Sequence, residues 1–153
     1  MTLDDIDRGI LAILQVDNQV TATELAGKVP LSPAAVQRRI NRLRKAGVIE
    51  ADVSIVSPRA AGRPISMLVL VSLERERADI IDRFKRAIAS TPEVMSGYYV
   101  TGDADFALIV TAEDMEEYEA FTRRFFYENQ DIKGFKTMVV MDRVKAGFTL
   151  PLG

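Results

Sequence analysis

The sequence predicts an α+β protein made of two parts, and three observations predict it. Residues 3–46 carry apolar side chains at helical spacing, and residues 65–142 alternate between strand-like and helix-like segments in a pattern that repeats at about forty residues. Between them, residues 57–64 are rich in residues that break regular structure. The expected boundaries are a helical domain over residues 1–50, a strand-like linker over 51–64 and a mixed domain over 65–153.

Two helices, the second of them short, are predicted at the start of the chain. The first is expected between Leu3 and Val16, where isoleucines recur at helical spacing and aspartates in the first turn suit the positive end of the helix dipole. The second opens at Thr21, because Thr21 and Glu24 have the spacing of a capping box, and it ends at Pro30.

A third helix completes a helix-turn-helix pattern. Ser32 is expected to cap it, with Pro33 as its first residue, Ala46 at its end and Gly47 as its C-cap. Two helices joined by a turn of about three or four residues form a motif whose second helix enters the major groove of DNA. At about 100° per residue, one face of this helix is apolar and the opposite face is small, polar and basic. The apolar residues are Val36, Ile40 and Leu43.

The opposite face holds the residues expected to contact DNA. Small side chains at its start permit close approach to base edges, Gln37 and Arg38 can make directional base contacts, and Arg42 and Lys45 suit phosphates. The simpler interpretation of the basic run is a solvated helix face, which the phasing makes the weaker one. The expected DNA-binding residues are Ser32, Ala34, Ala35, Gln37, Arg38, Asn41, Arg42 and Lys45.

The composition excludes several classes of protein. The 153 residues include no Cys and no His, so disulfides, Cys/His zinc sites and Ser-His-Asp triads are excluded. No apolar run is long enough to span a bilayer, which predicts a cytoplasmic protein without a membrane partner. The net charge is −2, made of +1 over residues 1–60 and −3 over residues 61–153. We expect no enzyme activity, no catalytic residues, no metal and no cofactor.

From residue 65 onward the predicted elements follow the order βαββαβ of a ferredoxin-like domain. Helices cover only one face of such a sheet, and the other face should be polar if it met water. Leu68 and Leu70 make that face apolar, which predicts a sheet-to-sheet dimer able to reach two DNA half-sites, with a wholly intramolecular core as the alternative. Strands are expected at Ile65–Leu73, Val94–Thr101, Phe106–Ala112 and Phe135–Asp142, and helices at Ala78–Ala89 and Asp114–Tyr127.

Five segments spread along the chain carry a resemblance to a known family. They are Leu3–Asp7, Leu31–Leu43, Gly47–Ile49, Val100–Phe106 and Thr137–Met141. Together they resemble the leucine-responsive/AsnC (Lrp/AsnC) family of feast/famine transcription regulators over essentially the whole chain. The resemblance implies an amino-acid-sensing ferredoxin-like domain, homodimers formed through it and frequently an octamer of four dimers. It also implies an effector bound between dimers, close to the Gly-Asp-x-Asp turn.

That turn is the candidate effector site. Its glycine and aspartates are usual turn formers, and spacing alone favours a structural role. In the functional interpretation, the glycine lets backbone donors approach a carboxylate while an aspartate or a carbonyl receives the ammonium of a free amino acid. Ala104 stands where many family members have an aromatic residue, so the identity of the effector does not carry over. The candidate effector-binding residues are Gly102, Asp103, Ala104, Asp105 and Thr137.

Three other functions compete with that of a regulated transcription factor. A regulatory subunit of an amino-acid biosynthetic enzyme would leave the basic third helix without a task. A sirohaem decarboxylase of the same architecture would need histidine near the haem, and the chain has none. A DNA-organising protein without a ligand stays open on the sequence alone.

Overall fold

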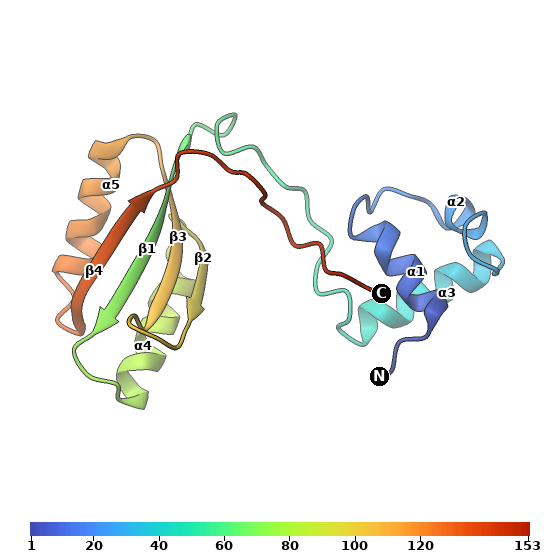
Figure 1. Ribbon diagram of the computed structural model, residues 1–153, viewed down its shortest axis with the longest axis horizontal. Coiled ribbons are helices and arrows are strands. Elements are labelled where there is room, and N and C mark those ends of the chain that lie inside the picture. Colours follow the sequence, from blue (N-terminus) through green and yellow to red (C-terminus); the bar gives the residue numbers. More distant parts are fainter. The chain divides into compact units, whose positions relative to one another are not determined.

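The computed structural model describes all 153 residues, which form two compact units (Figure 1). One unit is Met1–Ser54 together with Val144–Gly153, and the other is Ile55–Arg143. The first is helical and the second is a four-stranded sheet with helices, which confirms the predicted α+β class. None of the helices has the length and apolar character needed to cross a membrane.

The first unit contains helices α1 (Asp5–Leu14), α2 (Ala22–Ala26) and α3 (Pro33–Lys45). The predicted caps are present: the Thr21 hydroxyl accepts from the backbone N–H of Glu24 in a capping box, and the Ser32 hydroxyl accepts from that of Ala35 at 3.2 Å. Gly47 follows α3 with a φ of 76°, the left-handed conformation that ends many helices. The helix-turn-helix of α2 and α3 is therefore confirmed.

The second unit holds the predicted βαββαβ order, with all pairs antiparallel and strands in the order β2-β3-β1-β4. Helix α5 continues as a π-helical segment, η1. The bounds are β1 (Ile65–Leu73), α4 (Ala78–Ala89), β2 (Val94–Tyr99), β3 (Phe106–Ala112), α5 (Met115–Thr122), η1 (Arg123–Tyr127) and β4 (Ile132–Val139).

The core of the second unit lies between the helices and one face of the sheet. Its aromatic rings pack closely, with Phe84 and Phe106 centroids 4.8 Å apart and those of Phe126 and Phe135 4.3 Å apart. On β2, a Cβ added at Gly97 would lie 2.6 Å from the Ile88 side chain of α4. Glycine is therefore required for α4 to approach the sheet as closely as it does.

Several elements end earlier than the sequence predicts, such as β2 at Tyr99 rather than Thr101 and β4 at Val139 rather than Asp142. Three further differences are larger. The predicted strand-like linker is wrong: no strand occurs between α3 and β1, since a strand needs a partner and this segment pairs with none within the chain. The last strand begins at Ile132 rather than Phe135, because Leu73 at the end of β1 pairs with Ile132. The segment Val144–Gly153 belongs to the first unit, where the Gln15 side-chain amide exchanges two hydrogen bonds with the backbone of Leu150, at 2.8 and 2.9 Å.

Candidate nucleic-acid interface and effector loop

The inner face of α3 is buried and its outer face is open, as the helical phasing predicts. Val36 and Leu43 are fully buried and Ile40 is 4% exposed. The residues expected to contact DNA lie on the outer face or at its N-cap, and all are exposed except half-buried Ala35. The geometry of α3 is thus that of a helix with one surface free for a partner.

Two amides on this outer face are already aligned. The Gln37 Nε2 donates to the Asn41 Oδ1 at 2.9 Å, one turn along the helix. Each amide keeps unused groups, the carbonyl of Gln37 and the NH₂ of Asn41, which are of the kind that pair with base edges. The pair therefore presents one acceptor and one donor group on the face beside Arg38.

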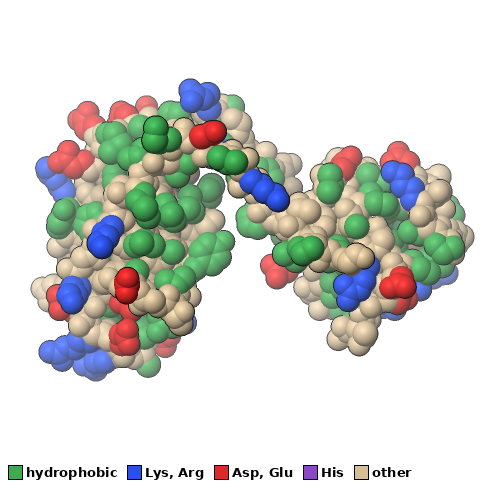
Figure 2. Space-filling model, viewed as in Figure 1, with side chains coloured by type: hydrophobic (Ala, Val, Ile, Leu, Met, Phe, Trp, Pro, Cys, Tyr) green, Lys and Arg blue, Asp and Glu red, His purple; other side chains and the backbone are tan.

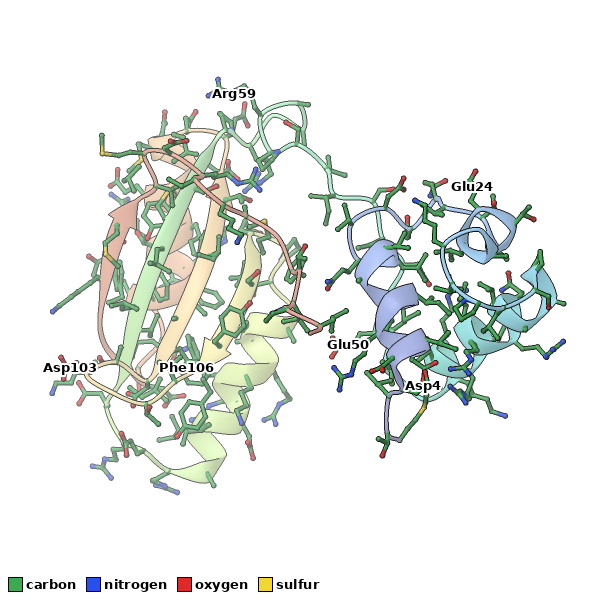
Figure 3. The ribbon with its side chains drawn as sticks, turned by 45° about the vertical axis from the view of Figure 1, so that its right-hand side comes forward. Asp4, Glu24, Glu50, Arg59, Asp103 and Phe106 are labelled. Carbon is green, nitrogen blue, oxygen red and sulfur yellow. The ribbon has the colours of Figure 1, made fainter.

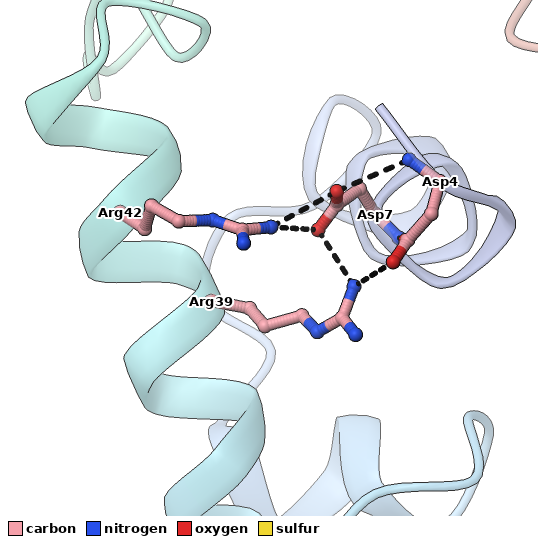
Figure 4. Close-up of polar contacts among 4 residues, drawn as sticks. All are labelled: Asp4, Asp7, Arg39 and Arg42. Carbon is pink, nitrogen blue, oxygen red and sulfur yellow. Dashed lines mark hydrogen bonds and ion pairs between the residues drawn. The ribbon is translucent and has the colours of Figure 1, made fainter. Parts of the chain in front are cut away.

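Two arginines of α3 are bound to acids of α1 (Figure 4). The Arg42 Nη2 lies 2.9 and 3.0 Å from the two carboxylate oxygens of Asp7, and the Arg39 Nη1 lies 3.1 Å from one of them. Asp7 is 1% exposed. Arg39 Nη1 also lies 2.5 Å from Asp4, and that hydrogen bond lowers the pKa of the Asp4 carboxyl to about 2. The sequence predicts that Arg42 contacts phosphate, but in the structure its guanidinium also donates to Asp7 of α1.

A third arginine of α3 is paired with the segment that follows the helix. The Arg44 guanidinium donates to both carboxylate oxygens of Asp52, at 2.8 and 3.2 Å. This bond lowers the pKa of the Asp52 carboxyl and raises the pKa of Arg44. Of the five cations in the basic run, only Arg38 and Lys45 have no acidic partner within the chain.

The sequence reasoning missed the three acids that pair with α3. By helix position alone, Asp4 and Asp7 are only favourable charges at the start of a helix, and the predicted boundaries place Asp52 in the linker. The i, i+3 spacing of Asp4 and Asp7, shared with the capping box that they form, is the signal that could have indicated a common face of α1.

The candidate effector loop connects β2 and β3. The Val100 N–H donates to the Asp105 carbonyl at 2.9 Å and closes the loop, in which Gly102 has a φ of 118°. The Asp105 carboxylate accepts from the backbone N–H of Leu73 at 2.7 Å, so it ties the loop to the end of β1. Asp103 lies exposed at the tip (Figure 3). The two aspartates therefore differ: one is used within the fold and the other is free.

Thr137 is not brought to this loop. It lies on β4 opposite Val69, in the middle of β1, and its hydroxyl is 2.5 Å from that of Tyr118 on α5. The loop meets β1 near its end and on the side of β3, whereas β4 flanks the other side of β1. Within one chain, Thr137 and the Gly102–Asp105 loop therefore occupy separate places.

A hollow that the sequence did not predict adjoins the loop. It measures about 470 Å³ and lies between α4 and the edge strand β2. Tyr99 and Phe106, which precede and follow the loop, line it, and the Lys85 Nζ lies 5.1 Å from the centre of the Tyr99 ring. The hollow thus combines apolar side chains, such as that of Ile88, with polar surface and one cation.

The face of the sheet opposite α4 and α5 is apolar, and no helix of the same unit covers it. Leu68 pairs with Ile109 on β3 and with Met138 on β4, which places all three on this face. Tyr98, opposite Ala107, is 56% exposed, and Met138 is 45% exposed. Figure 2 shows hydrophobic side chains gathered over the strands.

Each of the two units matches a known protein-family model. The model of the Lrp/AsnC ligand binding domain matches residues 66–150, and that of a winged helix-turn-helix DNA-binding domain matches residues 3–50. The chain is 71% identical over 152 residues to an uncharacterized HTH-type transcriptional regulator of Sinorhizobium fredii, covering 99% of this chain and 90% of that protein.

Two solved structures share the fold along nearly the whole chain. An AsnC family transcriptional regulator from Agrobacterium tumefaciens is 31% identical with a TM-score of 0.90, covering 98% of this chain and 97% of that one. A transcriptional regulator from Neisseria meningitidis in complex with L-Met is 28% identical with a TM-score of 0.91, covering 99% and 97%.

Proposed function

The chain belongs to the Lrp/AsnC family of DNA-binding transcription regulators, and from that premise we propose that α3 is the helix that reads the operator. The observation that carries this proposal is the separation of the two faces of α3, one buried and the other exposed with an unpaired arginine at its centre. Acting on DNA, the protein would work in the cytoplasm.

The proposed contacts divide by chemistry. Arg38 and the Gln37–Asn41 amide pair contact base edges, where bidentate groups discriminate between bases. Ser32, Ala34 and Ala35 lie at the start of the helix and permit close approach. Lys45, which has no acidic partner, contacts phosphate. Arg42 contributes less to phosphate binding than its position suggests, because one of its nitrogens is held by Asp7.

Substitution of Arg38 tests the reading role. Arg38→Ala should weaken binding to the operator by about 1–3 kcal/mol and binding to random DNA much less, because a base contact is specific to sequence. Lys45→Ala should weaken both and reduce the dependence on salt, because it removes a phosphate contact. The control is Arg86→Ala, which removes an exposed cation from α4. Fluorescence titrations at several salt concentrations separate these results, and equal losses on both DNAs with Arg38→Ala would refute its role.

We also propose that the apolar sheet face joins two copies of the chain. Two-fold pairing of this face would bury Leu68, Ile109 and Tyr98, which otherwise meet water. A two-fold dimer also supplies two recognition helices for two half-sites of one operator. The supporting observation is that the helices of the sheet unit pack on the other face of the sheet and leave this one without cover from their own unit.

For the effector, we propose an amino acid bound at the Gly102–Asp105 loop and the hollow beside it. The exposed carboxylate of Asp103 would accept hydrogen bonds from the ammonium group of the amino acid, and backbone N–H groups near Gly102 would donate to its carboxylate. The apolar side chains that line the hollow would contact a sizeable side chain of the amino acid. The L-Met bound to the similar Neisseria protein supports an effector of this class. Thr137 would join such a site only from another copy of the chain.

The two aspartates of the loop provide an internal comparison for the test. In a thermal-shift screen over the common amino acids, the intact protein should respond to at least one, and Asp103→Ala should abolish the response without changing the stability of the free protein. Asp105→Ala should lower stability even without ligand, because it removes the bond to Leu73. An unchanged response in Asp103→Ala would place the effector elsewhere, and no response to any amino acid would favour the ligand-independent DNA-organising alternative.

A further inference from the structure

Helix α3 offers a partner fewer unpaired positive charges than its sequence implies. Three of its five cations are paired with acids of the same unit, and two of these three are held by one residue, Asp7. This residue has no place in the contacts proposed above. Its burial and its bonds therefore require a separate explanation.

Asp7 is saturated by its partners. Its carboxylate accepts the two bonds from Arg42, one from Arg39 and a fourth, at 3.2 Å, from the backbone N–H of Asp4 (Figure 4). A buried carboxylate is tolerated only when its oxygens are paired in this way. The same bonds fix both guanidinium groups against α1, and the side chain of Arg39 is only 24% exposed as a result.

We propose that Asp7 is a specificity-determining residue, which restrains Arg39 and Arg42 and so limits the attraction of α3 to DNA of any sequence. The inference rests on the proposed function, in which α3 faces DNA. Attraction to random DNA grows with the number of phosphates neutralised, each of which adds about 0.9 to the slope of log affinity against log salt. With the two arginines restrained, binding depends on Lys45 for phosphate and on Arg38 and the amide pair, which discriminate between bases.

Removal of the Asp7 charge should release Arg42, the more exposed of the two arginines, toward phosphate. We expect Asp7→Asn to bind a random-sequence duplex more tightly, with a salt slope steeper by about one per chain. The ratio of operator affinity to random-DNA affinity should fall by about 3- to 10-fold, because the freed cation strengthens binding at every position on the DNA, whatever its sequence. The orientation of α3 against α1, which Asp7 also fixes, would become looser.

A matched control is available in the same turn of α1. Asp5 is exposed, has no ion pair, and Asp5→Asn removes the same charge without releasing an arginine. The experiment measures fluorescence anisotropy of a labelled random duplex with the intact chain at several salt concentrations, together with the melting temperature. Asp7→Asn should steepen the slope and Asp5→Asn should leave it unchanged.

Two further variants keep the inference open to refutation. Adding Arg42→Ala to Asp7→Asn should abolish the gain, because the released cation is then missing. If Asp7→Asn does not fold, Asp4→Asn removes one of the two acidic partners of Arg39, leaves its bond to Asp7 in place, and should steepen the slope by a smaller amount. A purely structural role predicts a lower melting temperature and weaker binding with an unchanged slope, and that result would overturn the inference. Failure of the unmodified protein to bind DNA would overturn the proposed function itself.

Discussion

The two units of this protein treat their surfaces in opposite ways. In the helical unit the apolar core is small and closed, and the cations of α3 are largely neutralised by acids from neighbouring segments. In the sheet unit the core is larger, with Phe84 and Phe106 at its centre, yet a second apolar face is left uncovered. In the proposed function, the first unit binds DNA through the few charges of α3 that have no acidic partner. The second unit binds another copy of itself through its apolar sheet face.

The largest expected effect comes from a charge on the uncovered sheet face. Ile109→Glu places a carboxylate opposite Leu68, and an unpaired charge in an apolar interface costs about 3–5 kcal/mol. The dimer should dissociate at least about 100-fold more readily, and operator affinity should fall with it. Sedimentation velocity measures the mass and titration measures the affinity. The control is Ala78→Glu, at the exposed start of α4. A dimer of unchanged affinity in Ile109→Glu would contradict the contrast between the two surfaces.

Core substitutions should show that the two units are separately stabilised. Phe106→Ala should cost about 3–5 kcal/mol in the sheet unit, and Leu25→Ala about 2–5 kcal/mol in the helical unit. Each substitution should shift one unfolding transition and leave the other in place. Denaturant titration followed by circular dichroism and by tyrosine fluorescence distinguishes them, since all four tyrosines lie in the sheet unit. A single transition that both substitutions shift equally would show one cooperative body instead.

A smaller effect tests how tightly the sheet unit is packed. Gly97→Ala should destabilise it by about 1–3 kcal/mol, because the new Cβ would meet the Ile88 and Leu108 side chains at 2.6 and 3.2 Å. Gly134→Ala on β4 is the matched control, since a Cβ there meets nothing within 4 Å. Equal melting temperatures for the two variants would mean that α4 can move away from the sheet without cost.

The smallest expected effect is the pH dependence of the helical unit. The pKa of Asp4 is lowered by Arg39 to about 2, so the stabilisation is present above its ordinary value of 3.8 and is lost as the pH falls toward 2. Asp4→Asn should therefore remove part of the loss in melting temperature that this unit shows between about pH 5 and about pH 3. Identical acid sensitivity in the variant and the unmodified protein would assign the loss to other carboxylates.

Much of the fold could be predicted because local signals and tertiary packing agree. Caps at Thr21 and Ser32 determine where helices begin, and two-sided apolarity identified β1 and β3 with their observed bounds. The start of β4 could not be predicted, because it is determined by pairing with the end of β1 rather than by its own pattern. The prediction of a strand-like linker is wrong for a related reason, since β-branched residues such as Val53 and Ile55 favour a strand only where a partner strand exists.

The candidate sites show the same difference between features that local sequence predicts and features that depend on contacts between distant residues. The outer face of α3 follows from helical phase alone, and Arg38 is exposed where the phase places it. The bonds from Asp7 to Arg39 and Arg42 join residues more than thirty positions apart, and no local pattern indicates them. Thr137 was grouped with the Gly102–Asp105 loop by resemblance, and the strand order separates the two within one chain.

The contrast between the two units is tested most directly by the mass of the sheet unit on its own. Residues 55–143, expressed without the helical unit, should sediment as a dimer or larger at micromolar concentration, because their uncovered face remains complete. The same fragment with Ile109→Glu should sediment as a monomer. A folded but monomeric fragment without that substitution would contradict the assignment of the sheet face as the surface that joins two copies of the chain.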